Sequence, residues 1–188
     1  MDKNEQWEEE QIEEATQEAM EDAQEDGIQL DEAKVERFIE QKRMEQNLVV
    51  AIIAGAVAAI VSAILWAVVT VATGYQIGYM AIAVGLIVGF AVRLGRGIDP
   101  VYGFIGAGFA LLGCIIGNYL SMIGFLANEM GSGVMEALSL IPMGEIPGIM
   151  INSLEPMDFL FYGIALYCGY KYGTADINEE ELIAQTRK

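Results

Sequence analysis

Few side chains in the apolar part of this 188-residue chain have groups that do chemistry. The sequence contains no histidine, and its two cysteines, Cys114 and Cys168, both lie inside apolar runs. The polar residues within the long apolar runs are Ser62, Thr70, Gln76, Asn118 and Ser121. Hydrogen bonds between apolar helices contribute about 0.6–2 kcal/mol each. We expect these groups to hold helices together, and the alternative is that they line a path for a polar solute or ion.

Gln76 and Asn118 are the predicted polar contact. Gln76 stands near the start of the apolar run 75–92, and Asn118 lies in the second half of the apolar run 101–127. Consecutive runs that cross a membrane in alternating directions bring these two positions to the same side. The two amides are therefore expected to meet near one membrane surface.

The residues give little support to catalysis or to a bound metal. No Asp, Glu, Lys, Arg or His interrupts the first three apolar runs, although ion-coupled transporters usually place such groups at membrane depth. A nucleophile with a neighbouring base is not recognisable. A calcium loop centred on Gly27 fails because Ala33 stands where the loop needs a bidentate Glu. We predict a protein that is not an enzyme, with no catalytic residues, no metal site and no cofactor.

Glycines form the most regular pattern in the sequence. Six of them fall between Thr73 and Gly97. Because glycine is a poor helix former, their presence in an apolar helix calls for an explanation. A spacing of seven plus four occurs twice and keeps three glycines on one helix face. The predicted helix-packing glycines are Gly55, Gly78, Gly85, Gly89, Gly106, Gly113 and Gly117. Small residues let helix backbones approach closely inside a membrane, and the alternative is that these glycines line a narrow pore or form a hinge.

The apolar runs predict an all-α fold. Leu48–Thr73 has 26 residues without a charge, 75–92 has 18, 101–127 has 27, and a shorter fourth run covers 157–170. About 20 residues suffice to cross a bilayer. Asp99 and Pro100 suit the N-cap and first turn of the third helix. We therefore predict an integral membrane four-helix bundle over residues 48–173, with an outer loop at 128–156 that contains a short surface helix near 134–141.

Charge separates a soluble extension from this membrane domain. Residues 1–47 hold 17 acidic and 5 basic side chains, whereas the whole chain has a net charge of −17. We expect an acidic helical extension at 1–47 and a tail at 174–188. In the extension, Asp31 is expected to cap a helix that carries Val35, Phe38 and Ile39 on one face and runs directly into the first span. Such an extension would repel nucleic acid and would suit a basic or coiled-coil partner.

The basic residues predict the orientation. With four spans, all ten Lys and Arg residues fall on the side that holds both termini and the 93–99 loop, and the other side has none. The positive-inside rule then places both termini in the cytoplasm. Arg93 and Arg96 are predicted to be topology anchors or contacts for lipid headgroups. Because residues 1–47 are acidic and no short apolar stretch follows the start, we expect no cleavable signal peptide.

Two stretches resemble small bacterial four-span membrane proteins of unknown function. These are Y-Q-I-G-Y-M-A-I-A-V-G, beginning at Tyr75, and E-P-M-D-F-L-F-Y-G, beginning at Glu155. The resemblance covers about residues 48–172, and Ala83 stands where such proteins often have glycine. It implies a multi-pass protein of the bacterial inner membrane and implies no activity.

These observations lead to one functional prediction and one alternative. We expect a non-catalytic structural or assembly subunit of the membrane, embedded in the lipid bilayer and forming a homo-oligomer or joining a membrane-protein partner through its glycine-rich helix faces. The alternative is a channel or transporter for a small solute, formed at an oligomer axis.

Overall fold

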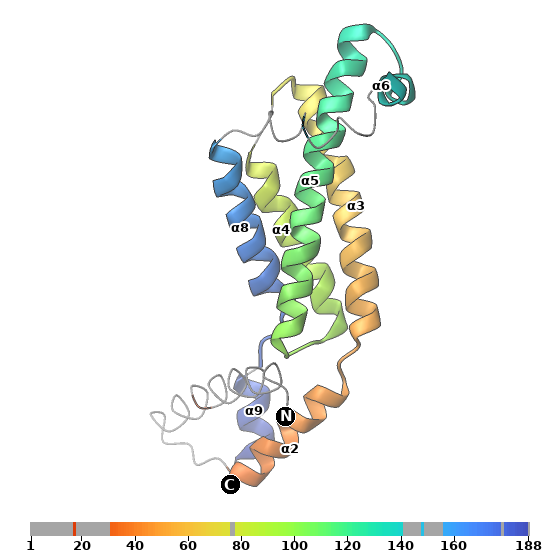
Figure 1. Cartoon of the computed structure of the whole chain (residues 1–188). Helices are drawn as coiled ribbons and strands as arrows, with labels where there is room; N and C mark the ends of the chain where they lie inside the picture. The colour runs from red at the N-terminus through yellow and green to blue at the C-terminus, as the bar shows by residue number, and fades with distance from the viewer. Residues whose placement is uncertain are drawn as a thin grey trace.

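The computed structural model in Figure 1 describes residues 31–75, 78–140, 156–177 and 179–187, together with positions 17 and 148. Within these ranges every regular element is a helix and no strand occurs. The elements are α2 (Glu32–Met44), α3 (Leu48–Thr73), α4 (Tyr79–Val92), the 3-10 turn η1 (Arg93–Gly95), α5 (Pro100–Met130), α6 (Val134–Leu140), α8 (Pro156–Gly173) and α9 (Glu179–Thr186). The predicted all-α class is confirmed for the described residues.

The two longest helices have clear local start and stop signals. The Asn47 side chain accepts a hydrogen bond from Val50 N at 3.0 Å and begins α3. Gly74 ends α3 with a φ of 73°, and Gly131 ends α5 with a φ of 63°. Both values lie in the left-handed region that glycine adopts easily. Both helices are long and apolar enough to cross a membrane, at about 39 Å for α3 and about 46 Å for α5.

The other two predicted spans differ from the expected ranges. The second begins as helix α4 only at Tyr79, four residues after the predicted start, because the left-handed turn at Gly74 ends α3 and Tyr75 lies in a bend. The fourth is longer than predicted and runs from Pro156 to Gly173. At 14 and 18 residues, α4 and α8 are about 21 Å and 27 Å long. That they cross a membrane remains a prediction.

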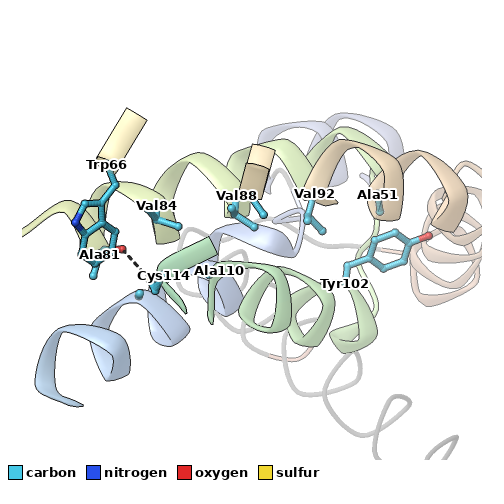
Figure 2. Packing of buried hydrophobic residues seen from close by; sticks show 11 residues of the cluster. Ala51, Trp66, Ala81, Val84, Val88, Val92, Tyr102, Ala110 and Cys114 are labelled. Carbon is cyan, nitrogen blue, oxygen red and sulfur yellow. Dashed lines mark hydrogen bonds between the residues drawn. The ribbon is translucent and has the colours of Figure 1, made fainter. Parts of the chain in front are cut away.

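Helices α3, α4, α5 and α8 pack into a bundle (Figure 1). Helix α3 lies against α4 and α5, and α8 lies against the same two helices, so α4 and α5 form the centre. Their shared core combines small and branched side chains with the aromatic rings of Trp66 and Tyr102. Figure 2 shows it as a continuous row that includes Trp66, Val84, Val88, Val92, Tyr102, Ala110 and Cys114. The centre of the bundle is therefore filled.

The surface of α3 is strongly apolar. Only 33% of its most apolar stretch is buried in the molecule. Large aliphatic side chains are exposed along its whole length, including Val49, Ile53, Val57, Ile60, Val61, Ile64 and Val68. A core helix of a soluble protein would bury such residues, because each fully buried Val, Ile or Leu contributes about 1.5–3 kcal/mol. The α3 surface thus needs an apolar environment outside the chain.

Below the bundle, α2 and α9 pack side by side as an antiparallel helix pair (Figure 1), although they are far apart in the sequence. We call this pair the α2–α9 hairpin. Its core consists of Val35, Phe38 and Leu182. The predicted cap of α2 is confirmed, since Asp31 Oδ1 accepts from Ala33 N at 3.2 Å. The expectation that α2 runs directly into α3 is wrong, because the helix ends at Met44 and Asn47 caps a new one. The tail predicted at 174–188 contains helix α9.

The opposite end of the bundle, which we call the distal end, carries the short helix α6. The short helix expected near 134–141 is confirmed over Val134–Leu140, although Ile141 lies outside the described residues. Its place on a membrane surface remains a prediction. Ala137 is fully buried against Ile123 and Ala127 of α5. In contrast, Val134 and Met135 are exposed. Helix α6 is thus held by one small residue and presents apolar side chains outward.

Candidate functional site

The glycines of α4 form the contact with α8. A Cβ atom on Gly85 would lie 2.6 Å from the Ala165 carbonyl oxygen, and one on Gly89 would lie 3.0 Å from the Cys168 carbonyl oxygen. At Gly78, just before α4, a Cβ atom would meet the Phe161 ring. Side-chain carbon atoms do not fit at such distances from a backbone. Gly85 and Gly89 therefore bring the backbones of α4 and α8 together, and Gly78 leaves room for the Phe161 ring of α8.

The glycines of α5 contact three neighbouring helices. Gly106 faces the backbone of Gly169 on α8. Gly113 instead lies between Val84 of α4 and Ala59 of α3, and Gly117 lies beside the Trp66 ring of α3. The three α5 glycines thus contact α8, α4 and α3, whereas the three matching glycines at α4 contact only α8.

Gly55 and three unpredicted glycines complete these contacts. On α3, a Cβ atom on Gly55 would lie 2.7 Å from Val92 Cγ2 and 2.8 Å from Phe109 Cδ2. Opposite Gly106, a Cβ atom on Gly169 would lie 2.6 Å from the Gly106 carbonyl oxygen, and Gly173 and Gly103 continue the same crossing. Gly169 and Gly173 have the small-xxx-small spacing that marks close helix pairs. This spacing could have identified Gly169 and Gly173 as packing glycines from the sequence.

The predicted polar pair is only partly described. Asn118 is 7% exposed, and its Nδ2 donates to the Tyr162 hydroxyl of α8 at 3.1 Å. Gln76 lies outside the described residues, so its predicted contact with Asn118 remains a prediction. Tyr162 was missed in the sequence because a tyrosine in an apolar run gives no sign of which helix its hydroxyl will meet.

Arg93 and Arg96 both contact carboxylates of the same chain. Arg93 Nη2 lies 2.8 Å from Asp176 Oδ2, just after α8, and Arg96 Nη1 lies 3.4 Å from Glu45 Oε2, just after α2. Their predicted role as topology or lipid anchors is untested by these contacts. Exposed ion pairs are worth about 0–1 kcal/mol, and the Arg96 side chain is 73% exposed, so its contact with Glu45 contributes little to stability.

The 93–99 loop is the junction between the bundle and the α2–α9 hairpin. Asn47 N donates to Gly95 O at 2.8 Å, and Ala175 N donates to Gly97 O at 2.7 Å. Both segments that lead to the hairpin are therefore tied to this one loop. Further along the hairpin, Lys42 Nζ pairs with Glu181 at 2.9 Å.

Asp99 has a different role from the predicted one. It occupies the N-cap position of α5, and Pro100 follows at the first turn as expected. Its side chain, however, makes no capping hydrogen bond. Asp99 Oδ2 instead accepts from Gln46 Nε2 at 2.7 Å, and Oδ1 lies 3.6 Å from Arg43 Nε. A charged donor and an amide on the neighbouring segment compete successfully with the local backbone.

A shallow recess of about 180 Å³ lies between α2 and α9. Its lining combines two cations, two amides and one ring: Lys34, Arg37, Gln41, Gln185 and Phe38. Lys34 Nζ already donates to the Arg187 carbonyl oxygen at 3.0 Å. In the described part of the chain, no group of three His, Cys, Asp or Glu side chains is placed to hold a metal ion.

No protein-family model, curated protein or solved structure matches this chain. The resemblance to bacterial four-span proteins therefore stays a prediction. The functional conclusion has to rest on the helix contacts, the apolar surface and the charge distribution described above.

Proposed function

We propose that this chain is a multi-pass protein of the bacterial inner membrane, in which α3, α4, α5 and α8 cross the bilayer and both termini lie in the cytoplasm. The observation that carries the proposal is the exposed aliphatic surface along all of α3. Lipid tails provide the apolar surroundings that this surface needs. The lengths of α3 and α5 exceed the hydrocarbon thickness of about 30 Å.

Aromatic side chains at both ends of α4 and α8 support the same arrangement. Tyr75 and Tyr79 are exposed at the distal end. At the other end, Lys171 Nζ lies 5.8 Å from the centre of the exposed Tyr167 ring. Tyr and Lys at such positions anchor helices at the membrane–water interface. The shorter α4 and α8 are accommodated by local thinning of the bilayer.

The distribution of cations supports the orientation. Residues 44–92 and 97–170 contain no Lys or Arg. The described basic residues therefore lie in the α2–α9 hairpin, in the 93–99 loop and at the end of α8. By the positive-inside rule, this end faces the cytoplasm and the distal end faces outward.

Within this membrane domain, the chain acts as a non-catalytic structural or assembly subunit. Each of the seven predicted packing glycines contacts a side chain or backbone of the same chain. A homo-oligomer or a membrane partner therefore uses the exposed surface of α3 rather than the glycine faces. The acidic residues 1–26 recruit a basic or coiled-coil partner in the cytoplasm.

The alternative function is a channel or transporter for a small solute. Val84, Val88 and Ala110 fill the centre of the bundle, so a pathway through one chain is disfavoured, and an oligomer axis is the remaining place for it. The buried Asn118–Tyr162 hydrogen bond is the observation that favours this candidate, because polar groups within a membrane often mark solute paths.

Native mass spectrometry in mild detergent, combined with flux measurements in liposomes, separates the two candidates. The subunit function predicts a defined oligomer or a co-purifying partner, and no flux of ions or small neutral solutes. Replacing Glu8, Glu9, Glu10, Glu13 and Glu14 by Gln should release a cytoplasmic partner while the membrane-embedded oligomer stays intact. Specific flux through the purified protein alone would overturn the subunit function in favour of the channel.

A further inference from the structure

Two polar groups inside the distal half of the bundle have no hydrogen-bond partner among the described residues. They are Trp66 Nε1 and Thr70 Oγ1, both on α3. Trp66 is 1% exposed and Thr70 is 0% exposed. Leaving a buried donor or acceptor unpaired costs about 1–3 kcal/mol. Because of this cost, we expect a bound molecule to form hydrogen bonds with the two groups; we call it the occupant.

The two groups share one face of α3, because residues four apart lie one above the other on a helix. Helix α3 packs against α5 along this stretch: a Cβ atom on Gly117 would lie 3.1 Å from Trp66 Cε3, and one on Gly124 would meet Val71. These contacts advance along both helices together, so Thr70 lies at the level of Ser121. The Ser121 hydroxyl is 2% exposed and donates to Gly117 O at 2.8 Å, which leaves its oxygen able to accept.

This site lies where the four-helix packing ends. Figure 2 shows Trp66 at the end of the core row beside Ala81, in the first turn of α4, with the indole nitrogen on the side of the ring away from Val84. Beyond this level α3 continues for seven residues to Thr73, or about 10 Å. Toward the α2–α9 hairpin, Val84, Val88 and Val92 are apolar. The buried Ser62 hydroxyl, one turn before Trp66, already donates to Ala58 O at 2.7 Å.

The chemistry of the three groups selects a small uncharged occupant. An indole N–H only donates, whereas a hydroxyl group both donates and accepts. Because the Ser121 proton is already donated to Gly117 O, the occupant must accept from Trp66 and donate to Ser121. Helix α3 has no charged residue, and α5 has none before Glu129, so an ion would lack a counter-charge from these two helices. Water meets these requirements, and buried water typically makes two to four hydrogen bonds.

We propose that the distal half of the α3–α5 contact contains an internal water site formed by Trp66, Thr70 and Ser121. The water accepts from Trp66 Nε1 and donates to Thr70 Oγ1 and Ser121 Oγ. The site does not depend on whether the protein is a subunit or a channel.

Trp66 itself provides the measurement. In the full-length Trp7→Phe variant, Trp66 is the only indole, because the chain has two tryptophans. Ultraviolet resonance Raman spectra report the hydrogen bonding of its N–H, and transfer to D2O reports its exchange. We expect a hydrogen-bonded N–H that exchanges in the folded protein. A free N–H, or an N–H that exchanges only on unfolding, would overturn the site.

Two further variants test the source of the hydrogen bond. Adding Thr70→Val should shift the Trp66 band toward the free N–H position, because the bridging water loses one acceptor. The control is Thr73→Val on the same helix, whose hydroxyl already donates to Val69 O at 2.8 Å; it should leave the band unchanged. An unshifted band in Thr70→Val would contradict the bridge. Loss of the hydrogen bond in Gln76→Leu would identify a side chain of this protein as the acceptor and overturn the water site.

Discussion

At the scale of single residues, the absence of a side chain decides how closely the helices approach. Gly85 and Gly169 each face a backbone carbonyl oxygen, which has little freedom to move away. Gly163, by contrast, sits in the middle of α8 with nothing within 4 Å of a Cβ position. Gly85 therefore has no room for a larger residue, whereas Gly163 has room for one.

Replacing Gly85 by Ala should destabilise the bundle, because its Cβ would lie 2.6 Å from the Ala165 carbonyl oxygen and 2.8 Å from the Ala165 Cα. Forcing a methyl group into a packed contact costs about 1–3 kcal/mol. The matched control, Gly163→Ala, should be neutral or should stabilise by about 0.4–1 kcal/mol. Thermal unfolding in detergent measures both. A Gly85→Ala protein as stable as the control would show that α4 and α8 are farther apart.

At the scale of elements, the α2–α9 hairpin is expected to be less stable than the four-helix bundle to which it is attached. Its core has three buried apolar side chains, Val35, Phe38 and Leu182, whereas the bundle core extends over four helices. Two backbone hydrogen bonds to the 93–99 loop and a few exposed ion pairs hold it in place. Such an element is expected to open before the bundle unfolds.

Leu182→Ala should open this hairpin selectively. Leu182 is 1% exposed and packs between Val35 and Phe38, and Leu→Ala changes in cores cost about 2–5 kcal/mol. We expect faster amide exchange over residues 31–44 and faster tryptic cleavage at Lys34 and Arg37, with an unchanged unfolding temperature of the bundle. The control is Gln185→Ala on the exposed face of α9. A lowered bundle unfolding temperature would show that the two units unfold together.

At the scale of the whole molecule, charge and apolar surface are separated along the bundle axis. The apolar surface belongs to the four packed helices, and the cations gather at the α2–α9 end. Asp176 and Glu45 compensate two of those cations. This separation predicts one orientation in the membrane.

A cysteine at Met135 tests that orientation. Met135 on α6 is 79% exposed, whereas the hydroxyl oxygen of the nearby Ser132 is buried. Met135→Cys should react with a membrane-impermeant maleimide added to intact cells, and Gln185→Cys should react only after permeabilisation. The native Cys114 and Cys168 are buried and should add little background. The reverse pattern of labelling would place the termini outside and refute the proposed topology.

Some features of the fold were predictable because their causes are local. The start and end of α3 follow from Asn47 and Gly74, which bond to groups within one helical turn, and the run between them is uncharged. The same holds for the Asp31 cap of α2. The late start of α4 was not predictable from hydropathy, because Tyr75 is as compatible with a helix as Tyr79 is.

By itself, the sequence determined the helical class, the apolar runs, the side of the chain that carries the cations and the face on which each set of glycines lies. Only the tertiary structure decided which partner each group meets. Gly117 faces α3, Gly113 lies between α3 and α4, and Gly106 faces α8. Arg93 reaches Asp176, 83 residues away. Caps and periodicity depend on neighbours within a turn, whereas these contacts depend on how four helices are placed around one another.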